Sequence, residues 1–300
     1  MKANPDNKNL EIVDFESAKN FYFDQQYQKA ITGFASFLIT YTESARQQEV
    51  KYYMGESHYR LRNFDKALPF YTELSNDSGY NLSNKVVARI AEIQFKQAKY
   101  DQAIESFHRV EKLAANKKEL YIAWSGLMES YYLLTQYDSV NTYANLIIER
   151  GNVNAGSQNK ASLFLGKVAM ARGDYENAKD EFLSTLNTAR DEYGAEAKYR
   201  IGEIFYLTKE HKQCAETLIS LSTEFEGYEE WVGKSFLLLA DNYLEMNDTF
   251  QAKATLQSLI DNNFPLQYIK DTAKDKLKVL EDTERKEKIK QNADTLGTNR

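Results

Sequence analysis

The side chains best suited to catalysis or metal binding are few in this chain of 300 residues. There are three histidines, His58, His108 and His211, and one cysteine, Cys214. His108 has no cysteine or histidine partner at the spacing of a zinc site, and a single cysteine allows neither an intrachain disulfide nor a cysteine-based zinc site. The sequence also lacks a glycine-rich phosphate loop, an HExxH motif and a nucleophile elbow. We therefore predict that the protein is not an enzyme and needs no cofactor or metal; metal analysis and a panel of hydrolase substrates would detect an unrecognised site.

An internal repeat accounts for most of the chain. The clearest copy is the stretch 166–182, in which two short amphipathic helices face each other across a turn at 172–174, with Gly166 and Ala178 where the helices would touch. The counterparts of Ala178 are Ala30, Ala67, Ala103, Val140, Cys214 and Ala252, so the successive steps are 37, 36, 37, 38, 36 and 38 residues. The counterparts of Gly166 are Ala18, Gly55, Ala91, Met128, Gly202 and Ala240. Four residues after the Ala178 position come Phe34, Tyr71, Phe107, Ala144, Phe182, Leu218 and Leu256.

The repeat also gives the reactive side chains structural roles. Cys214 stands in the Ala178 position and is interpreted as a small buried apolar residue. His211 stands three residues before that position, where most copies have an aromatic residue. His58 is equivalent to Phe21 and Tyr131 in the first helix of other copies. We expect all three to contribute to packing.

This pattern resembles the tetratricopeptide repeat, a helix-turn-helix unit that stacks into a right-handed superhelix. The period exceeds the 34 residues usual in that family, and the proline that commonly closes each unit is mostly absent, with only Pro265 near the expected place. The resemblance implies an all-α solenoid, in which each repeat contacts only its neighbours.

The predicted domain organisation follows from the repeat. We expect a disordered lead over 1–12, an array over 13–264, a capping helix over 265–288 and a disordered tail over 289–300. The glycine- and asparagine-rich stretch 151–157 interrupts the array and is a candidate hinge. The seven predicted repeats are 14–43, 46–77, 83–115, 118–150, 157–190, 193–226 and 229–263.

The amino-acid composition limits the kinds of molecule that the protein could bind. The net charge of −6 argues against nucleic acid, whose binding depends on clustered Lys and Arg. No apolar run approaches the ~20 residues that span a bilayer, and the first residues lack the apolar segment of a signal peptide. We expect a protein or peptide partner and a monomeric chain.

The family resemblance implies a groove lined by the first helix of each repeat. Its side chains lie about three residues before, one after and four to five after the Gly166 position. The resulting candidate binding residues are the aromatic Tyr22, Tyr59, Phe95, Tyr132 and Tyr206 and the acidic Glu56, Glu92, Glu129 and Glu203. Such a face predicts an extended or helical peptide with basic and apolar or proline side chains, since aromatic rings attract cations. In the alternative interpretation, the acids form i,i+4 pairs on a solvated face and the aromatic rings pack between neighbouring first helices, with only their hydroxyls exposed.

The sequence also shows two more specific resemblances. Co-chaperones of this family clamp a C-terminal carboxylate with Lys, Asn and Arg side chains; Lys85 and Arg89 match the last pair, but Glu56 would repel a carboxylate. The runs 27–38, 41–44 and 52–57 are more similar to repeats of bacterial cell-envelope proteins, among them the Tol–Pal-associated coordinator and repeat proteins of Bacteroidetes-type bacteria. This resemblance implies a periplasmic or cell-envelope scaffold; a cytoplasmic location is the alternative.

The sequence is compatible with two functions. The first is a non-enzymatic scaffold that binds a peptide or protein segment in its groove. The second is a structural spacer or self-association module within a longer multi-repeat protein. Light scattering over a concentration series distinguishes them, because a self-associating module grows with concentration.

Overall fold

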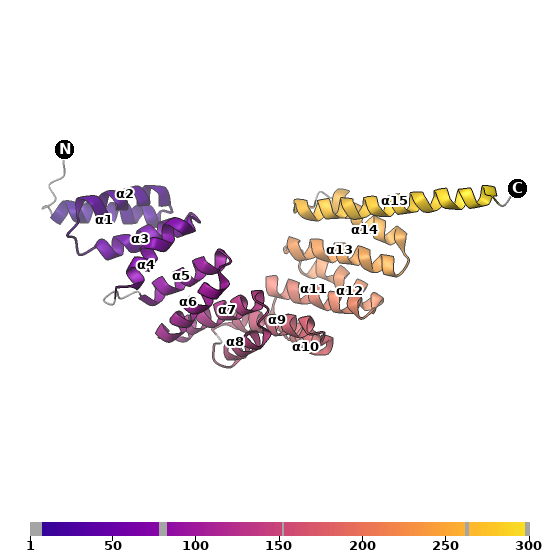
Figure 1. The fold of residues 1–300 in the computed structure, drawn as a ribbon, viewed down its shortest axis with the longest axis horizontal. Helices are drawn as coiled ribbons and strands as arrows, with labels where there is room; N and C mark the ends of the chain where they lie inside the picture. The colour runs from indigo at the N-terminus through magenta and orange to yellow at the C-terminus, as the bar shows by residue number, and fades with distance from the viewer. Residues whose placement is uncertain (1–7, 78–82, 152, 262–263, 298–300) are drawn as a thin grey trace. The chain divides into compact units, whose positions relative to one another are not determined.

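The computed structural model describes residues 8–77, 83–151, 153–261 and 264–297. Within these ranges the protein is all α-helical, with fifteen helices and no strand. The chain divides into two compact units, Met1–Val153 and Asn154–Arg300. Figure 1 shows helices α1 to α8 in the first unit and α9 to α15 in the second, stacked within each unit in chain order. The division falls within the stretch 151–157 that the sequence analysis predicts as an interruption.

The first unit consists of four helical hairpins. In each hairpin a first helix and a second helix pack against each other, and the second helix also packs against the first helix of the next hairpin. The helices are α1 (Lys8–Phe23), α2 (Tyr27–Thr40), α3 (Gln47–Arg60), α4 (Phe64–Ser75), α5 (Ser83–Lys96), α6 (Tyr100–Leu113), α7 (Lys117–Leu133) and α8 (Tyr137–Glu149).

The second unit consists of three hairpins and a long final helix. Its helices are α9 (Ala155–Ala171), α10 (Tyr175–Thr188), α11 (Glu192–Leu207), α12 (His211–Glu224), α13 (Glu229–Glu245), α14 (Thr249–Asp261) and α15 (Gln267–Gly297). Helix α9 begins earlier than predicted, because Asn154 and Ser157 form a capping box that satisfies its first backbone N–H groups.

The small residues of the repeat lie where the two helices of each hairpin meet. All seven residues at the Ala178 position are completely buried. At the Gly166 position a Cβ atom on Gly166 would lie 2.6 Å from the Phe182 ring, and one on Gly202 would lie 2.5 Å from Leu218 Cδ2. The helices therefore approach too closely for a larger residue at these two glycines. This packing is why the small-residue pattern predicts the hairpins correctly.

Every hairpin also turns in the same way. One residue in each turn has a positive φ: Gln25, Arg62, Ala98, Thr135, Gly173, Lys209 and Asn247, with φ between 57° and 78°. These residues follow one another at the same steps as the Ala178 position, so the turn is part of the repeat. Only Gly173 is a glycine, which has no Cβ to clash in this left-handed conformation.

The two ends of the chain differ from the predicted boundaries. Helix α1 already begins at Lys8, so residues 8–12 are helical where the sequence predicts disorder. Contacts remote in sequence hold the first two turns of α1, since Ser44 Oγ donates to Glu11 Oε1 over 2.5 Å and the Tyr41 hydroxyl donates to Asp14 Oδ2 over 2.7 Å. Residues 1–7 of the predicted lead lie outside the described residues.

Helix α15 packs against α13 and α14. Ile269 and Ala273 are completely buried against the Leu256 and Leu259 side chains of α14. Lys276 of α15 pairs with Asp241 of α13 over 2.6 Å. The helix extends to Gly297, past the predicted boundary at 288, because no proline or glycine interrupts it before that residue. Residues 289–297, for which the sequence predicts disorder, belong to α15 in the structure, and 298–300 lie outside the described residues.

Candidate functional site

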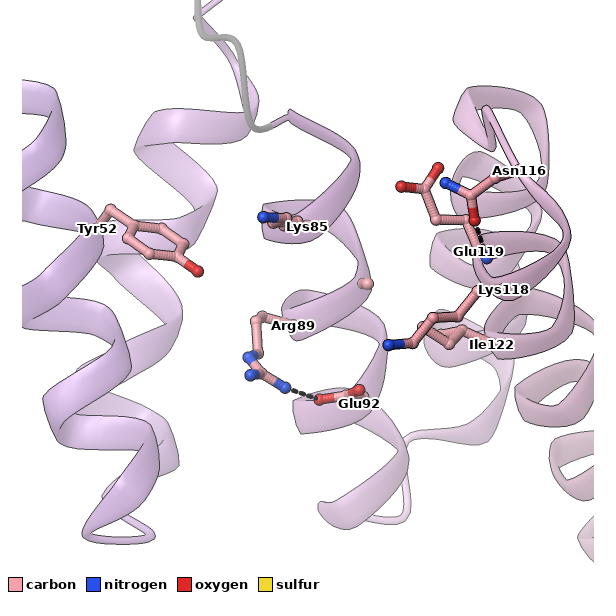
Figure 2. A pocket seen from close by; sticks show the side chains of 9 residues that line it. Tyr52, Lys85, Arg89, Glu92, Asn116, Lys118, Glu119 and Ile122 are labelled. Atoms are coloured by element: carbon pink, nitrogen blue, oxygen red, sulfur yellow. Dashed lines mark hydrogen bonds and ion pairs between the residues drawn. The ribbon is translucent and has the colours of Figure 1, made fainter. Parts of the chain in front are cut away.

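A pocket opens on the face of the first unit formed by the first helices α3, α5 and α7. Its volume is about 370 Å³. Figure 2 shows its lining, in which Tyr52 of α3 and Lys118 of α7 point toward α5 from opposite sides. The residues that line it are Tyr52, Lys85, Ala88, Arg89, Glu92, Asn116, Lys118, Glu119 and Ile122. Three consecutive repeats therefore contribute side chains to one site, which none of them forms alone.

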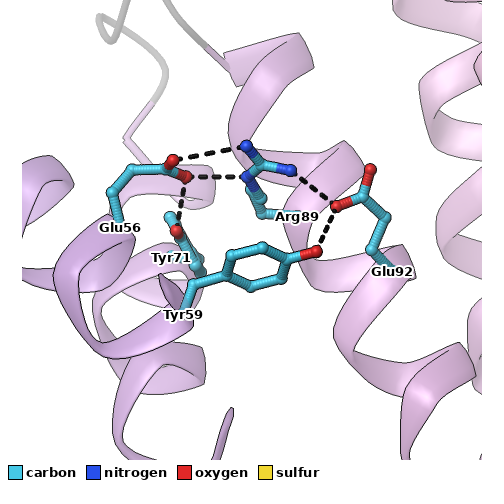
Figure 3. A network of polar contacts seen from close by, with 5 residues as sticks. All are labelled: Glu56, Tyr59, Tyr71, Arg89 and Glu92. Atoms are coloured by element: carbon cyan, nitrogen blue, oxygen red, sulfur yellow. Dashed lines mark hydrogen bonds and ion pairs between the residues drawn. The ribbon is translucent and has the colours of Figure 1, made fainter. Parts of the chain in front are cut away.

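A network of polar contacts connects α3, α4 and α5 beside this pocket (Figure 3). Glu56 is 2% exposed, and its carboxylate accepts a hydrogen bond of 2.6 Å from the Tyr71 hydroxyl and one of 2.7 Å from Arg89 Nε. Arg89 Nη1 donates to Glu92 over 2.7 Å, and the Tyr59 hydroxyl donates to the same Glu92 oxygen over 3.0 Å. The network thus pairs one guanidinium with two carboxylates, which makes a buried carboxylate tolerable.

The pKa values of the network follow from burial and charge. Burial and the Glu56 carboxylate raise the pKa of Tyr71 far above its ordinary value. Burial and Glu92 raise the pKa of Tyr59 to about 12. Burial alone would lower the pKa of Arg89, but its hydrogen bonds and the charges of Glu56 and Glu92 raise it. The tyrosines therefore remain neutral donors and the guanidinium remains charged at neutral pH.

The pocket wall on α7 begins at the helix N-terminus. Asn116 caps the helix, because its side-chain oxygen accepts from the Glu119 backbone N–H over 3.0 Å. The Glu119 carboxylate accepts from the Ala115 backbone N–H and from Asn84, each over 2.8 Å. The first of these bonds is the main reason that the pKa of Glu119 lies below its ordinary value. Glu119 is therefore ionised, and hydrogen bonds within the protein fix the position of its carboxylate.

The predicted aromatic residues are half-buried, and most pair across the turn of their own hairpin. Their ring centroids lie close to those of the aromatic residue that opens the second helix. The pairs are Tyr22 with Tyr27 at 5.7 Å, Tyr59 with Phe64 at 5.7 Å, Phe95 with Tyr100 at 5.6 Å and Tyr132 with Tyr137 at 6.2 Å. Tyr206 packs near the Cys214 and Leu239 core of the second unit. Such pairs stabilise each turn, so these four rings pack within their own hairpins, whereas the alternative interpretation places them between neighbouring first helices.

The predicted acidic residues are bound to side chains of their own chain. Glu56 is buried, and so departs from the expectation of an acid on an open face. Glu92 bonds to Arg89, Glu129 accepts from Ser125 Oγ over 3.2 Å, and Glu203 pairs with Arg200 over 2.8 Å. Glu203 and Tyr206 belong to the second unit, while the other seven predicted residues belong to the first. Only Glu92 of the nine lines the pocket.

The structure adds pocket residues that the sequence analysis did not select. Tyr52 and Ala88 both stand three residues before the Gly166 position, a column that the family resemblance already marks as groove-facing. Lys85 and Ile122 share the column six residues before it. These four residues could therefore have been predicted from the repeat, because each lies three or six residues before the Gly166 position of its first helix.

A related charge cluster lies on the first helices of the second unit. Arg200 of α11 pairs with Glu203 over 2.8 Å and with Glu196 over 3.3 Å, as Arg89 pairs with Glu92 in the first unit. Lys167 of α9 occupies the position of Glu56 and pairs with Glu196 over 3.0 Å. Two repeats therefore contain an Arg–Glu pair at the same positions. The residue at the Glu56 position of the preceding first helix is acidic in the first unit (Glu56) and basic in the second (Lys167).

The histidines and the cysteine take part in packing and local hydrogen bonds. The His58 ring is stacked on Phe70 at 6.1 Å, and His211 Nδ1 lies 2.9 Å from Asn242 Oδ1. Cys214 is completely buried, and burial raises the pKa of its thiol to about 12. A buried thiol of this kind is inert at neutral pH. The described residues contain no group of three or more His, Cys, Asp and Glu side chains that could hold a metal ion.

Comparisons with known proteins support the fold and one repeat. Residues 234–265, which include α14 and most of α13, match the tetratricopeptide repeat family. No curated protein matches the chain. None of the helices in the described ranges has the length and apolar character that crossing a membrane requires.

Solved structures of repeat proteins share this fold at low sequence identity. A tetratricopeptide repeat protein from Parabacteroides merdae has a TM-score of 0.63 and 13% identity, covering 90% of this chain and 98% of that one. The C-terminal part of a repeat-containing protein from Cytophaga hutchinsonii has a TM-score of 0.62 and 14% identity, covering 86% and 98%. The apo form of the quorum sensor NprR from B. thuringiensis has a TM-score of 0.67 and 13% identity, covering 92% and 82%. The chain therefore has the helical-repeat fold of tetratricopeptide repeat proteins, which is typical of protein–protein interaction scaffolds.

Proposed function

We propose that this protein is a non-enzymatic scaffold that binds a segment of a partner protein on the face of its first unit formed by α3, α5 and α7. The observation that carries this proposal is the pocket of about 370 Å³, to which three consecutive first helices contribute. The pocket combines charged groups with the half-buried apolar side chains of Ala88 and Ile122. Apolar surface supplies contact area and the polar groups fix orientation, which is what a binding site needs.

Ile122 allows a direct test of this face. A random library of displayed 12-residue peptides would be selected against the intact chain, and the enriched peptides would be measured by fluorescence polarisation. Ile122→Arg places a bulky charge in the pocket, whereas Leu133→Arg makes the same change at an exposed leucine on the same helix α7. We expect Ile122→Arg to weaken binding about tenfold or more and Leu133→Arg to leave it within twofold. Peptides that bind both variants equally well would contradict the proposed face.

The place of this function in the cell is part of the proposal. The resemblance of the runs 27–38, 41–44 and 52–57 to repeats of cell-envelope proteins supports a role in cell-envelope assembly. Fractionation of the native cell would test it: the protein should be recovered with the periplasm or the envelope. Recovery in the cytoplasm would reject that role and leave the binding face untouched.

The function as a spacer or self-association module has one structural feature in its favour. Val279 and Ile289 of α15 are both 63% exposed, so the final helix carries apolar side chains without a described partner surface. We nevertheless propose a monomer, because two exposed residues ten positions apart bury too little area for a stable dimer. A molar mass by light scattering that rises with concentration would favour self-association.

A further inference from the structure

Two cations of the pocket are left without an ion pair. Lys85 of α5 and Lys118 of α7 are exposed, and both line the pocket. Neither forms a salt bridge or hydrogen bond through its side chain with any other residue in the described ranges. Figure 2 shows the Lys118 ammonium directed toward α5, on the side of that helix opposite the Tyr52 hydroxyl. Burial raises the pKa of Tyr52 to about 12, so its hydroxyl is a neutral hydrogen-bond donor.

The carboxylates around the pocket already accept hydrogen bonds from groups of the protein itself. Glu92 accepts hydrogen bonds from Arg89 and Tyr59, and Glu119 accepts them from Asn84 and the Ala115 backbone. Glu56 does not line the pocket, and it accepts hydrogen bonds from Arg89 and Tyr71. The carboxylates therefore have hydrogen-bond partners within the chain, whereas Lys85 and Lys118 form no ion pair with a residue that the structure describes, although the charge of Lys85 contributes to the lowered pKa of Glu119.

The third cation of the pocket, Arg89, is already paired with two carboxylates of the protein itself. Its Nε and Nη2 atoms donate to Glu56 over 2.7 and 3.3 Å, and its Nη1 atom donates to Glu92 over 2.7 Å. Likewise Lys19, which stands in the first repeat at the Glu56 position, pairs with Glu49 over 3.0 Å. Of the two residues that match a clamp for a C-terminal carboxylate, Arg89 is thus paired with acids of the protein itself, whereas Lys85 is paired with none in the part of the chain that the structure describes.

We propose that this pocket, on the binding face described above, receives the side-chain carboxylate of an aspartate or glutamate within an extended partner segment. The carboxylate lies between Lys85 and Lys118, while apolar neighbours in the segment pack on Ala88 and Ile122. This inference rests on the proposed function. It reverses the basic preference that the acidic residues of the sequence suggest, because Glu56 and Glu92 already accept hydrogen bonds from Arg89, whereas the ammonium groups of Lys85 and Lys118 have no ion-pair partner among the described residues.

The test uses the same library of displayed 12-residue peptides and the intact chain. The double variant Lys85→Ala/Lys118→Ala removes both free ammonium groups. Its matched control is Lys96→Ala/Lys117→Ala, which removes two exposed lysines from the same two helices without touching the pocket. A charge-reversed variant, Lys85→Glu/Lys118→Glu, would be selected separately.

We expect peptides that depend on Ile122 to be enriched in aspartate or glutamate. Their binding should weaken about tenfold in the double alanine variant and less than twofold in its control, as two partly exposed ion pairs would give. The charge-reversed variant should enrich lysine and arginine in place of the acids. Peptides that depend on Ile122 but carry no acid, or that bind the double alanine variant unchanged, would overturn this inference and leave the binding face standing. Failure to enrich any Ile122-dependent peptide would overturn both.

Discussion

The Tyr59 hydroxyl donates a hydrogen bond of 3.0 Å to Glu92 Oε2, which joins two neighbouring repeats. The sequence suggests that both side chains face a groove and are free to bind a partner. The structure instead makes them members of one network with Glu56 and Arg89 (Figure 3). The network holds α3 against α5, and the pocket opens beside it. Removing its members should therefore affect stability before it affects binding.

Glu56 should be the most important acid of this network for stability. Glu56→Gln leaves Arg89 and Tyr71 facing a neutral group in a site that is 2% exposed. We expect the free energy of unfolding to fall by about 2–4 kcal/mol. Glu92→Gln should cost about 1 kcal/mol or less, because the Glu92 side chain is 30% exposed. Urea unfolding followed by circular dichroism measures both, and equal losses would contradict the importance of burial.

Substitution by glycine at the left-handed turn residues should change the free energy of unfolding. Ala98→Gly and Thr135→Gly should each stabilise the protein by about 1 kcal/mol, since an L-residue with a side chain pays about 1–2 kcal/mol for that conformation. Asn247→Gly should have a smaller effect, because asparagine tolerates the conformation better. Gly173→Ala should destabilise without any steric clash, as no atom lies within 4 Å of the added Cβ.

Thermal unfolding of these four variants tests the conformational explanation. The melting temperatures should rise for the alanine and threonine positions and fall for Gly173→Ala. If Ala98→Gly lowered the melting temperature, the greater flexibility of glycine in the unfolded chain would outweigh the relief of strain.

The stability of the protein should depend on the protonation of His58. The pKa of His58 lies below its ordinary value, because burial and then the charge of Lys66 disfavour the protonated ring. The unfolded chain therefore binds this proton more readily than the folded chain. The contribution of His58 is fully present above the unfolded pKa of about 6.5 and is lost as the pH falls from that value through the folded pKa.

His58→Phe isolates this effect, because phenylalanine keeps the ring that stacks on Phe70 but cannot be protonated. Urea unfolding of wild type and variant between pH 7.5 and pH 5 should show the variant gaining relative stability as the pH falls. A constant difference across that range would show that His58 does not couple folding to protons.

Cys214 should report unfolding by its reactivity. Its thiol is completely buried with a pKa of about 12, so iodoacetamide at pH 8 should modify the native protein very slowly and the unfolded protein rapidly. Cys214→Ala should cost less than about 1 kcal/mol, because five of the seven repeats have alanine at this position. Cys214→Ser should cost about 1–3 kcal/mol, since it buries a hydroxyl among apolar side chains.

Mass spectrometry of the labelled protein at increasing urea concentration provides the measurement. Labelling should follow the unfolding transition of α12 and its neighbours. Fast modification in the absence of urea would show that this part of the second unit opens locally.

The repeat could be predicted from sequence because it depends on local rules. A small residue at Ala178 and its six counterparts recurs in step with the turns, so the hairpins and their order follow from spacing alone. The first and last residues of the helical array could not be predicted as accurately. The first two turns of α1 are held by Ser44 and Tyr41, which lie more than 25 residues away in the sequence. Periodicity within a short window carries no information about such contacts.

The sequence by itself determined the all-helical hairpins, their number and the columns of residues that face one another, because each of these depends on spacing within a single repeat. Only the tertiary structure decided which charges are free. Glu56 and Arg89 stand 33 residues apart on different helices, and their ion pair neutralises the acid that seemed to line a groove. Whether a charged side chain meets a partner protein or its own chain depends on its neighbours across repeats, and that information lies in the packing of α3, α5 and α7.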